Sequence, residues 1–169
     1  MFVANHTSYL DIPLMLAALS GAFVFVTKSE LLGWPIIARI TRAGGHIPVD
    51  RDRVESRGAV IGRIIKMLRA GRSVLVFPEG TFSYEDRLRS FQVGAFKAAL
   101  AAGAGVVPIA LIGVARVWSE SARFPRPGTV EIWIGEALRR TEAGGDEAEQ
   151  MEALRLATVQ FVERHLGRA

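Results

Sequence analysis

The sequence of 169 residues contains no cysteine. This absence excludes disulfides, thiolate metal sites and a covalent thioester on the chain. Lysine is scarce as well: of the 21 basic residues, only Lys28, Lys66 and Lys97 are lysines. The positive charge therefore resides on guanidinium groups, which bind phosphate and carboxylate in a planar, two-pronged geometry. With a net charge of +4, the chain favours anionic partners such as lipid headgroups, nucleic acid or nucleotide-bearing cofactors.

Long hydrophobic runs are also lacking. The N-terminus has no basic stretch followed by an apolar segment and a cleavage site, so we predict no signal peptide and a cytoplasmic location. Two uncharged runs, residues 12–27 and 98–115, are short and interrupted by proline and glycine. We interpret each as buried helix, turn and buried strand rather than a membrane span. The mean hydropathy of +0.24 nevertheless indicates work at a membrane surface.

The length predicts one domain, residues 1–169, with no repeat and no internal linker. Hydrophobic periodicity and breaker residues predict strands at 1–4, 22–27, 46–49, 73–77, 106–112 and 129–134. They predict helices at 11–19, 29–42 with an interruption at Trp34-Pro35, 54–70, 91–102 and 146–166. In the last helix, Met151, Leu154, Ala157 and Phe161 are expected to face the core. Several of these strands are apolar on both faces. The expected fold is α/β, with a central, largely parallel or mixed sheet covered by helices on both faces.

The first segment that suggests chemistry runs from Asn5 to Asp11. Its carboxylate lies five residues after a histidine, and on a continuous helix this spacing separates two side chains by about 140°. His6 and Asp11 can pair only if His6 lies in the turn before a helix and Asp11 reaches back from its first turn. His6 would then be a general base oriented by Asp11. A simpler interpretation is that Asp11 caps the helix and His6 is an ordinary loop residue.

A second segment, Phe77-Pro-Glu-Gly-Thr81, follows the clearest predicted strand. It therefore lies at the carboxyl end of that strand, where open α/β sheets place their sites. Gly80 lets a ligand approach backbone N–H groups closely, and Glu79 can accept hydrogen bonds from alcohol hydroxyls. A plain strand-to-loop turn explains the same residues equally well.

Taken together, these segments resemble the glycerolipid acyltransferases, the family of 1-acylglycerol-3-phosphate acyltransferases. Residues 6–11 are similar to the His-x4-Asp motif of that family. Three further blocks follow in family order, namely Gly45-His-Ile-Pro-Val-Asp-Arg51, Phe77-Pro-Glu-Gly-Thr81 and Val107-Pro-Ile109. The likeness extends from Val3 to about Glu136.

The resemblance implies that a fatty acyl group moves from acyl-CoA or acyl carrier protein to the free hydroxyl of a lysophospholipid, 1-acylglycerol-3-phosphate, in phospholipid biosynthesis. It implies His6 as the general base and Asp11 as its partner. Acceptor and phosphate binding would fall to Arg51, Glu79, Gly80 and Thr81, with support from Asn5, Pro108 and Lys97. Neither a metal, a further cofactor nor a covalent intermediate is required.

The sequence departs from the family pattern at two cationic positions. Phe82 stands where an arginine is common after the threonine, and Gln92 stands where a lysine is common. Arg87, Arg89 or Lys97 could substitute, yet these losses leave room for lyso-ornithine lipid or another acceptor without a phosphate. The apolar helical segment that usually precedes the first block is also missing from the sequence. We therefore expect peripheral contact with an anionic membrane on its cytoplasmic face.

Other functions stay open as alternatives. A hydrolase would use the same histidine and aspartate, but no Gly-x-Ser-x-Gly elbow is present, and Ser8 and Ser83 are poor nucleophile candidates. A non-catalytic lipid-binding module fits the missing cations. Nucleic-acid binding has only charge in its favour and is set aside. His46 is expected in a strand as a structural or headgroup-lining residue, and His165 at the surface of the last helix.

Overall fold

The computed structural model describes residues 1–33, 35–50, 54–83, 87–119, 121–140 and 145–167. In chain order its elements are β1 (Phe2–Ala4), α1 (Asp11–Ala18), β2 (Phe23–Lys28), the 3-10 helix η1 (Ser29–Gly33), α2 (Pro35–Gly44), β3 (Ile47–Val49), α3 (Val54–Arg69), β4 (Ser73–Val76), α4 (Gly94–Ala102), β5 (Val107–Ile112), α5 (Val114–Val117), β6 (Glu131–Ile134) and α6 (Glu147–Leu166). Each predicted strand and helix is present. The sequence did not predict α5, because four residues are too few to show a helical period.

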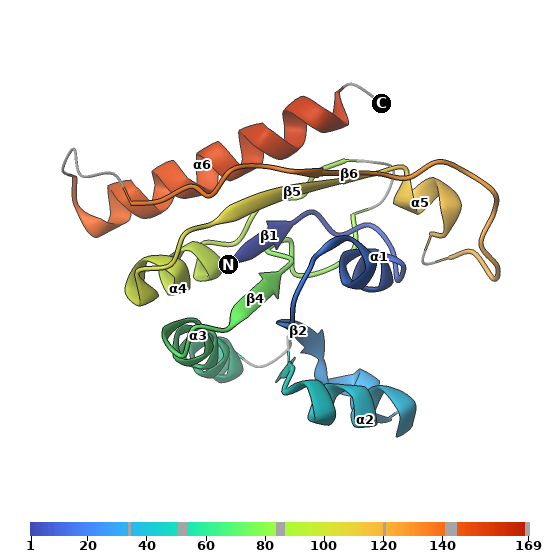
Figure 1. The fold of residues 1–169 in the computed structure, drawn as a ribbon, viewed down its shortest axis with the longest axis horizontal. Helices are drawn as coiled ribbons and strands as arrows, with labels where there is room; N and C mark the ends of the chain where they lie inside the picture. Colours follow the sequence, from blue (N-terminus) through green and yellow to red (C-terminus); the bar gives the residue numbers. More distant parts are fainter. Residues whose placement is uncertain (34, 51–53, 84–86, 120, 141–144, 168–169) are drawn as a thin grey trace.

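The strands form one six-stranded sheet in the order β3-β2-β4-β1-β5-β6 (Figure 1). All neighbouring pairs are parallel except β5 and β6, which are antiparallel. The prediction of a largely parallel or mixed sheet is therefore confirmed. Since β1 lies between β4 and β5, the segments that follow β1 and β4 emerge side by side at the carboxyl edge.

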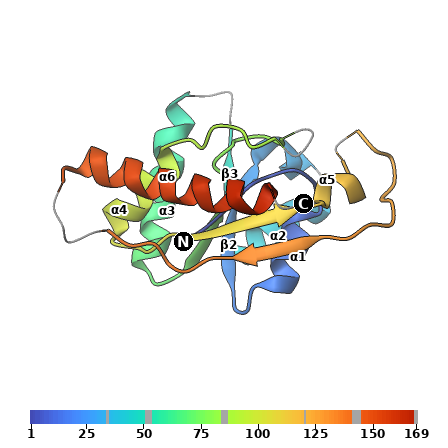
Figure 2. The ribbon, with the colours of Figure 1, turned by 90° about the horizontal axis from the view of Figure 1, so that it is seen from above.

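Alternate residues of each strand face opposite sides of the sheet. Val3, Val74 and Val76 belong to a core that includes side chains of α3, α4 and α6. Ala4 and Leu75 belong to a second core, with side chains of α1 and α5. Helices thus cover both faces, as predicted, and α6 lies along β5 (Figures 1 and 2). Among the described residues, the helices that contribute to the second core are the short α1 and α5. This face of the sheet therefore has less helical cover than the face packed against α3, α4 and α6.

The two uncharged runs fold as the sequence predicted. The first contains α1 after its first residue and β2 up to, but not including, its last residue, and the second contains most of α4 and all of β5. Within the described residues, no helix is both long and apolar enough to cross a membrane.

The last helix confirms most of the predicted core-facing stripe. Leu154 is buried, and Met151 and Phe161 are partly buried and pack against the core. Its buried residues are Gln150, Leu154, Thr158, Val162 and His165, so the buried face also includes polar side chains that the apolar pattern did not predict. The expectation that His165 is a surface residue is wrong, because only 7% of it is exposed. Its Nδ1 lies 2.8 Å from the Phe161 carbonyl oxygen, and its ring packs against Trp133. This hydrogen bond and the contact with Trp133 offset the cost of removing the imidazole from water.

Candidate active site

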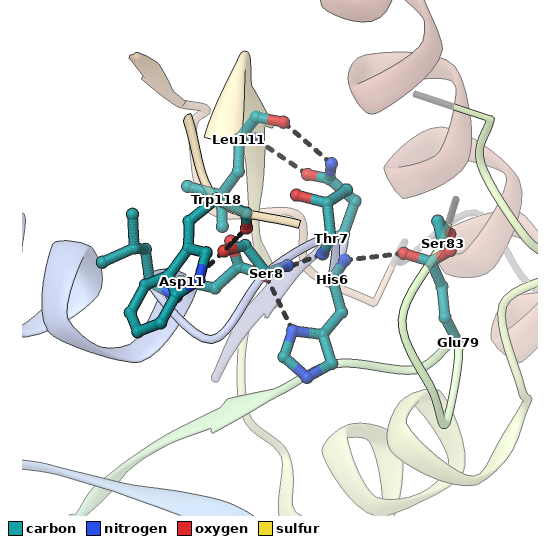
Figure 3. Close-up of polar contacts among 10 residues, drawn as sticks. His6, Thr7, Ser8, Asp11, Glu79, Ser83, Leu111 and Trp118 are labelled. Carbon is teal, nitrogen blue, oxygen red and sulfur yellow. Dashed lines mark hydrogen bonds and ion pairs between the residues drawn. The ribbon is translucent and has the colours of Figure 1, made fainter. Parts of the chain in front are cut away.

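His6 and Asp11 form a buried pair at the carboxyl edge of the sheet (Figure 3). His6 lies in the turn after β1, and Asp11 is the first residue of α1. The distance from His6 Nδ1 to Asp11 Oδ2 is 2.7 Å. This geometry confirms that the histidine precedes the helix that the aspartate begins.

The Asp11 carboxylate also orders the turn that carries the histidine. Its Oδ2 accepts hydrogen bonds from the backbone N–H groups of Thr7, at 2.7 Å, and Ser8, at 3.0 Å. Asp11 is wholly buried. A carboxylate that accepts Nδ1–H of His6 leaves the lone pair on Nε2. No described residue forms a hydrogen bond with Nε2, so this nitrogen is available to accept a proton.

Asn5 joins the same turn to the neighbouring strand. Its side-chain N–H donates to the carbonyl oxygen of Leu111 at 2.9 Å, and its Oδ1 accepts from Leu111 N–H at 2.8 Å. The amide thereby continues the pairing of β1 with β5 beyond the last strand residue, Ala4. These two hydrogen bonds help to fix the turn that carries His6.

Glu79 holds His6 from the other side. Its Oε1 accepts the backbone N–H of His6 at 2.7 Å (Figure 3). Its Oε2 accepts the Ser83 hydroxyl and the backbone N–H of Arg89, the latter at 2.8 Å. Burial raises the pKa of Glu79, while these three hydrogen bonds oppose the rise. Both carboxylate oxygens are thus engaged by the protein, and Glu79 is not among the residues that line the adjacent cleft.

Aromatic side chains enclose the imidazole. Phe77 stacks on the His6 ring with centroids 4.1 Å apart, and Phe82 lies against it at 4.2 Å. The Phe82 ring in turn contacts Tyr9 edge-on at 4.8 Å. The position where the family resemblance led us to expect an arginine therefore holds an apolar ring that packs against the proposed base.

A cleft of about 450 Å³ opens beside His6. It is lined by His6, Ser8, Tyr9, Ile12, Phe25, Val26, Thr27, Lys28, Glu30, Phe77, Gly80, Thr81 and Phe82. Its apolar wall suits an acyl chain, while Lys28 and Glu30 form an ion pair at its polar rim. Sequence reasoning missed this β2 wall. The available signal was that β2 also ends at the carboxyl edge and carries a lysine there.

Two of the predicted supporting residues lie away from the cleft. Pro108 is buried within β5, where it pairs with Val3, and Lys97 is exposed on α4; neither lines the cleft. Arg51 falls outside the described residues. Of the predicted acceptor-binding residues that the structure describes, Gly80 and Thr81 line the cleft and Glu79 does not.

The two serines considered as nucleophiles are engaged away from the base. The Ser8 hydroxyl donates to the carbonyl oxygen of Trp118, and the Ser83 hydroxyl donates to Glu79. A serine hydrolase requires a hydroxyl that donates to the histidine. This arrangement therefore disfavours the hydrolase alternative and leaves direct transfer as the chemistry that suits the pair.

Comparisons with known proteins agree with this chemistry. A family model described as Acyltransferase matches residues 1–112. The chain is 38% identical over 144 residues to the 1-acyl-sn-glycerol-3-phosphate acyltransferase LPAT1, chloroplastic, of Arabidopsis thaliana, which covers 85% of this chain and 40% of that protein. It is 37% identical to a lyso-ornithine lipid O-acyltransferase of Pseudomonas aeruginosa, over 66% of this chain and 42% of that protein.

A solved structure shares the fold. The crystal structure of the 1-acyl-sn-glycerophosphate acyltransferase PlsC from Thermotoga maritima matches with a TM-score of 0.80 at 26% identity. The match covers 96% of this chain and 64% of that one. The chain spans roughly two fifths of the length of the curated relatives named above, at 40% and 42%.

Proposed function

This chain belongs to the acyltransferase family, and on that basis we propose that it transfers a fatty acyl group from a thioester to the free hydroxyl of a lyso-lipid. The observation that carries the proposal is the 2.7 Å contact between His6 and the buried Asp11 beside a partly apolar cleft. A non-catalytic lipid-binding module would need the cleft but not this oriented base.

In the proposed reaction, Nε2 of His6 takes the proton of the acceptor hydroxyl as its oxygen attacks the thioester carbonyl carbon. Asp11 stabilises the imidazolium that forms. The tetrahedral intermediate then collapses, the carbon–sulfur bond breaks and the thiol leaves with the proton returned by His6. The donor is acyl-CoA or acyl carrier protein, and the chemistry uses no metal and no acyl-enzyme.

We propose 1-acylglycerol-3-phosphate as the acceptor, in phospholipid biosynthesis. The names of the relatives from Arabidopsis thaliana and Thermotoga maritima support this choice. A lyso-ornithine lipid is the second candidate, because Phe82 places an aromatic ring where a phosphate-binding arginine is common in the family. The similarity to the Pseudomonas aeruginosa enzyme also favours it.

The acceptor is a membrane lipid in either case, so we propose that the protein works peripherally on the cytoplasmic face of an anionic membrane. Its charge supports this, because guanidinium groups bind lipid phosphate. Each basic residue close to an anionic surface adds about 1 kcal/mol of attraction.

The decisive experiment measures acyl transfer from a labelled thioester to a panel of lyso-lipids. His6→Ala removes the base, and we expect kcat to fall by about 10²- to 10⁴-fold. Asp11→Asn leaves the ring without a carboxylate acceptor, and we expect a loss of at least about 10²-fold. Mass spectrometry of the products identifies the acceptor and the donor.

His165→Gln provides the matched control, since this histidine lies in α6 and does not line the cleft. Its transfer rate should stay within about twofold of the wild-type rate. Circular dichroism verifies that each variant is folded. If a folded His6→Ala variant transfers acyl groups at the wild-type rate, the proposed catalytic role of His6 is wrong and a lipid-binding module is favoured.

A further inference from the structure

The most exposed aromatic side chain among the described residues lies in the segment between α5 and β6. Residues 123–129, Arg-Phe-Pro-Arg-Pro-Gly-Thr, are all exposed, and Phe124 is 70% exposed, the highest value among the large hydrophobic side chains described. Figures 1 and 2 both show this segment extending beyond the sheet at one end of the molecule. A single exposed hydrophobic side chain is common on protein surfaces, and Phe124 gains significance from the held loop and the arginines beside it.

Hydrogen bonds at its base hold this segment in shape. The Arg126 N–H donates to the Val117 carbonyl oxygen at 2.7 Å, which closes the loop on α5. At the base of the loop, the Trp118 indole N–H donates to the Ala122 carbonyl oxygen at 2.9 Å. Pro125 and Pro127 restrict the backbone further. The loop, residues 121–128, is therefore tied to α5 and to Trp118 at its base and presents Phe124 to solvent.

The charge around Phe124 identifies the chemistry of the partner. The Arg123 guanidinium lies over the Phe124 ring, 5.6 Å from its centroid. The Arg126 side chain is exposed, and neither arginine forms an ion pair with a residue that the structure describes. An aromatic ring between cations fits the headgroup layer of an anionic bilayer, where rings meet the acyl boundary and guanidinium groups bind phosphate.

The loop is connected to the candidate active site. The Trp118 carbonyl oxygen, at its base, accepts the Ser8 hydroxyl from the turn that carries His6 (Figure 3). The Trp118 ring lies 6.4 Å from that of Tyr9, which lines the cleft. Because β5 is parallel to β1, the chain enters α5 at the same edge of the sheet where the cleft opens.

We infer that loop 121–128 is a membrane-contact element: Phe124 inserts at the boundary between headgroups and acyl chains of an anionic bilayer, and Arg123 and Arg126 bind lipid phosphates. The inference rests on the proposed function, because it explains how the cleft meets an acceptor that resides in the bilayer. It assigns the contact to one loop rather than to the net charge of the whole chain.

The test is cosedimentation of the full chain with vesicles that contain neither thioester nor lyso-lipid. Phosphatidylcholine vesicles are compared with vesicles of which about one third is phosphatidylglycerol. We expect Phe124→Ser to weaken binding to the anionic vesicles by about tenfold. The double variant R123E/R126E should weaken it by at least about 25-fold and remove the preference for anionic lipid. Leu156→Ser, at a 45% exposed position on α6, is the matched control and should bind as wild type.

A second measurement reports insertion directly. In Phe124→Trp, brominated lipids should quench the added fluorescence, whereas Leu156→Trp should not respond. Wild-type vesicle binding by both loop variants, or no quenching at position 124, would overturn the inference. If the variants instead lose only transfer from acyl carrier protein, the loop binds that acidic protein and the membrane assignment fails. Since binding is measured without substrates, it is independent of whether His6→Ala abolishes transfer.

Discussion

Glu79 is the residue whose part differs most from the one the family resemblance implied. It was expected to hold the acceptor, but its two oxygens accept hydrogen bonds from His6, Ser83 and Arg89. It thus joins the turn after β1 to the loop after β4. From these contacts we propose that Glu79 is a positioning residue for His6, the proposed base.

We therefore predict that Glu79→Gln lowers kcat by about 10- to 100-fold with little change in the acceptor KM, because a shifted base loses its alignment. The amide keeps one oxygen acceptor but places an N–H₂ group against other donors. Steady-state kinetics with varied acceptor concentration measure kcat and the acceptor KM separately. Ser83→Ala removes only one donor and should cost less. A raised KM with unchanged kcat would restore Glu79 as an acceptor ligand.

At the scale of elements, the junction of β5 and α5 lies against the backbone of Thr129, where loop 121–128 returns to the sheet. Gly113 occupies this junction with φ of +77°, and a Cβ atom there would lie 2.4 Å from the backbone oxygen of Thr129. A side chain would therefore meet both backbone strain and an immovable atom. Only glycine satisfies this close approach.

Gly113→Ala should consequently lower the free energy of unfolding by at least about 2 kcal/mol. Gly103→Ala is the control, since Gly103 has a similar φ of +65° but no atom within 4 Å of an added Cβ. It should cost about 1 kcal/mol, from backbone strain alone. Urea denaturation compares the two variants. Equal losses of unfolding free energy in the two variants would show that the Thr129 backbone moves away from the added Cβ atom.

For the whole molecule, His46 links stability to pH. Its ring stacks on Phe25 with centroids 3.6 Å apart, and its Nδ1 accepts the Phe25 N–H at 3.3 Å. Burial, and then the nearby Arg72, lower the pKa of His46 below its ordinary value of 6.5. The unfolded chain therefore binds the proton more readily than the folded one, and the Nδ1 hydrogen bond requires the neutral ring.

It follows that the free energy of unfolding should fall as the pH drops below 6.5 and through the lowered pKa of folded His46. His46→Gln cannot titrate, so its stability should depend less on pH over this range. Urea denaturation at a series of pH values provides the measurement for both proteins. Parallel pH profiles for wild type and variant would contradict this assignment.

Much of the fold was predictable because its elements are specified locally. Apolar runs with breaker residues located all six strands, and Asp146 with Glu149 forms the capping box that begins α6. The polar part of the buried face of α6 was not predicted, since periodicity cannot show that Thr158 and His165 find hydrogen bonds in the core. Nor could it show α5, which is a single turn.

By itself, the sequence determined the α/β class, the order of the elements and the turn that places His6 before the helix of Asp11, because these depend on residues close together in the chain. Only the tertiary structure decided the parts of Glu79 and Asn5. Their partners, His6 and Leu111, lie 73 and 106 positions away. Strand order brings such residues together, and it depends on packing of the whole sheet rather than on local pattern.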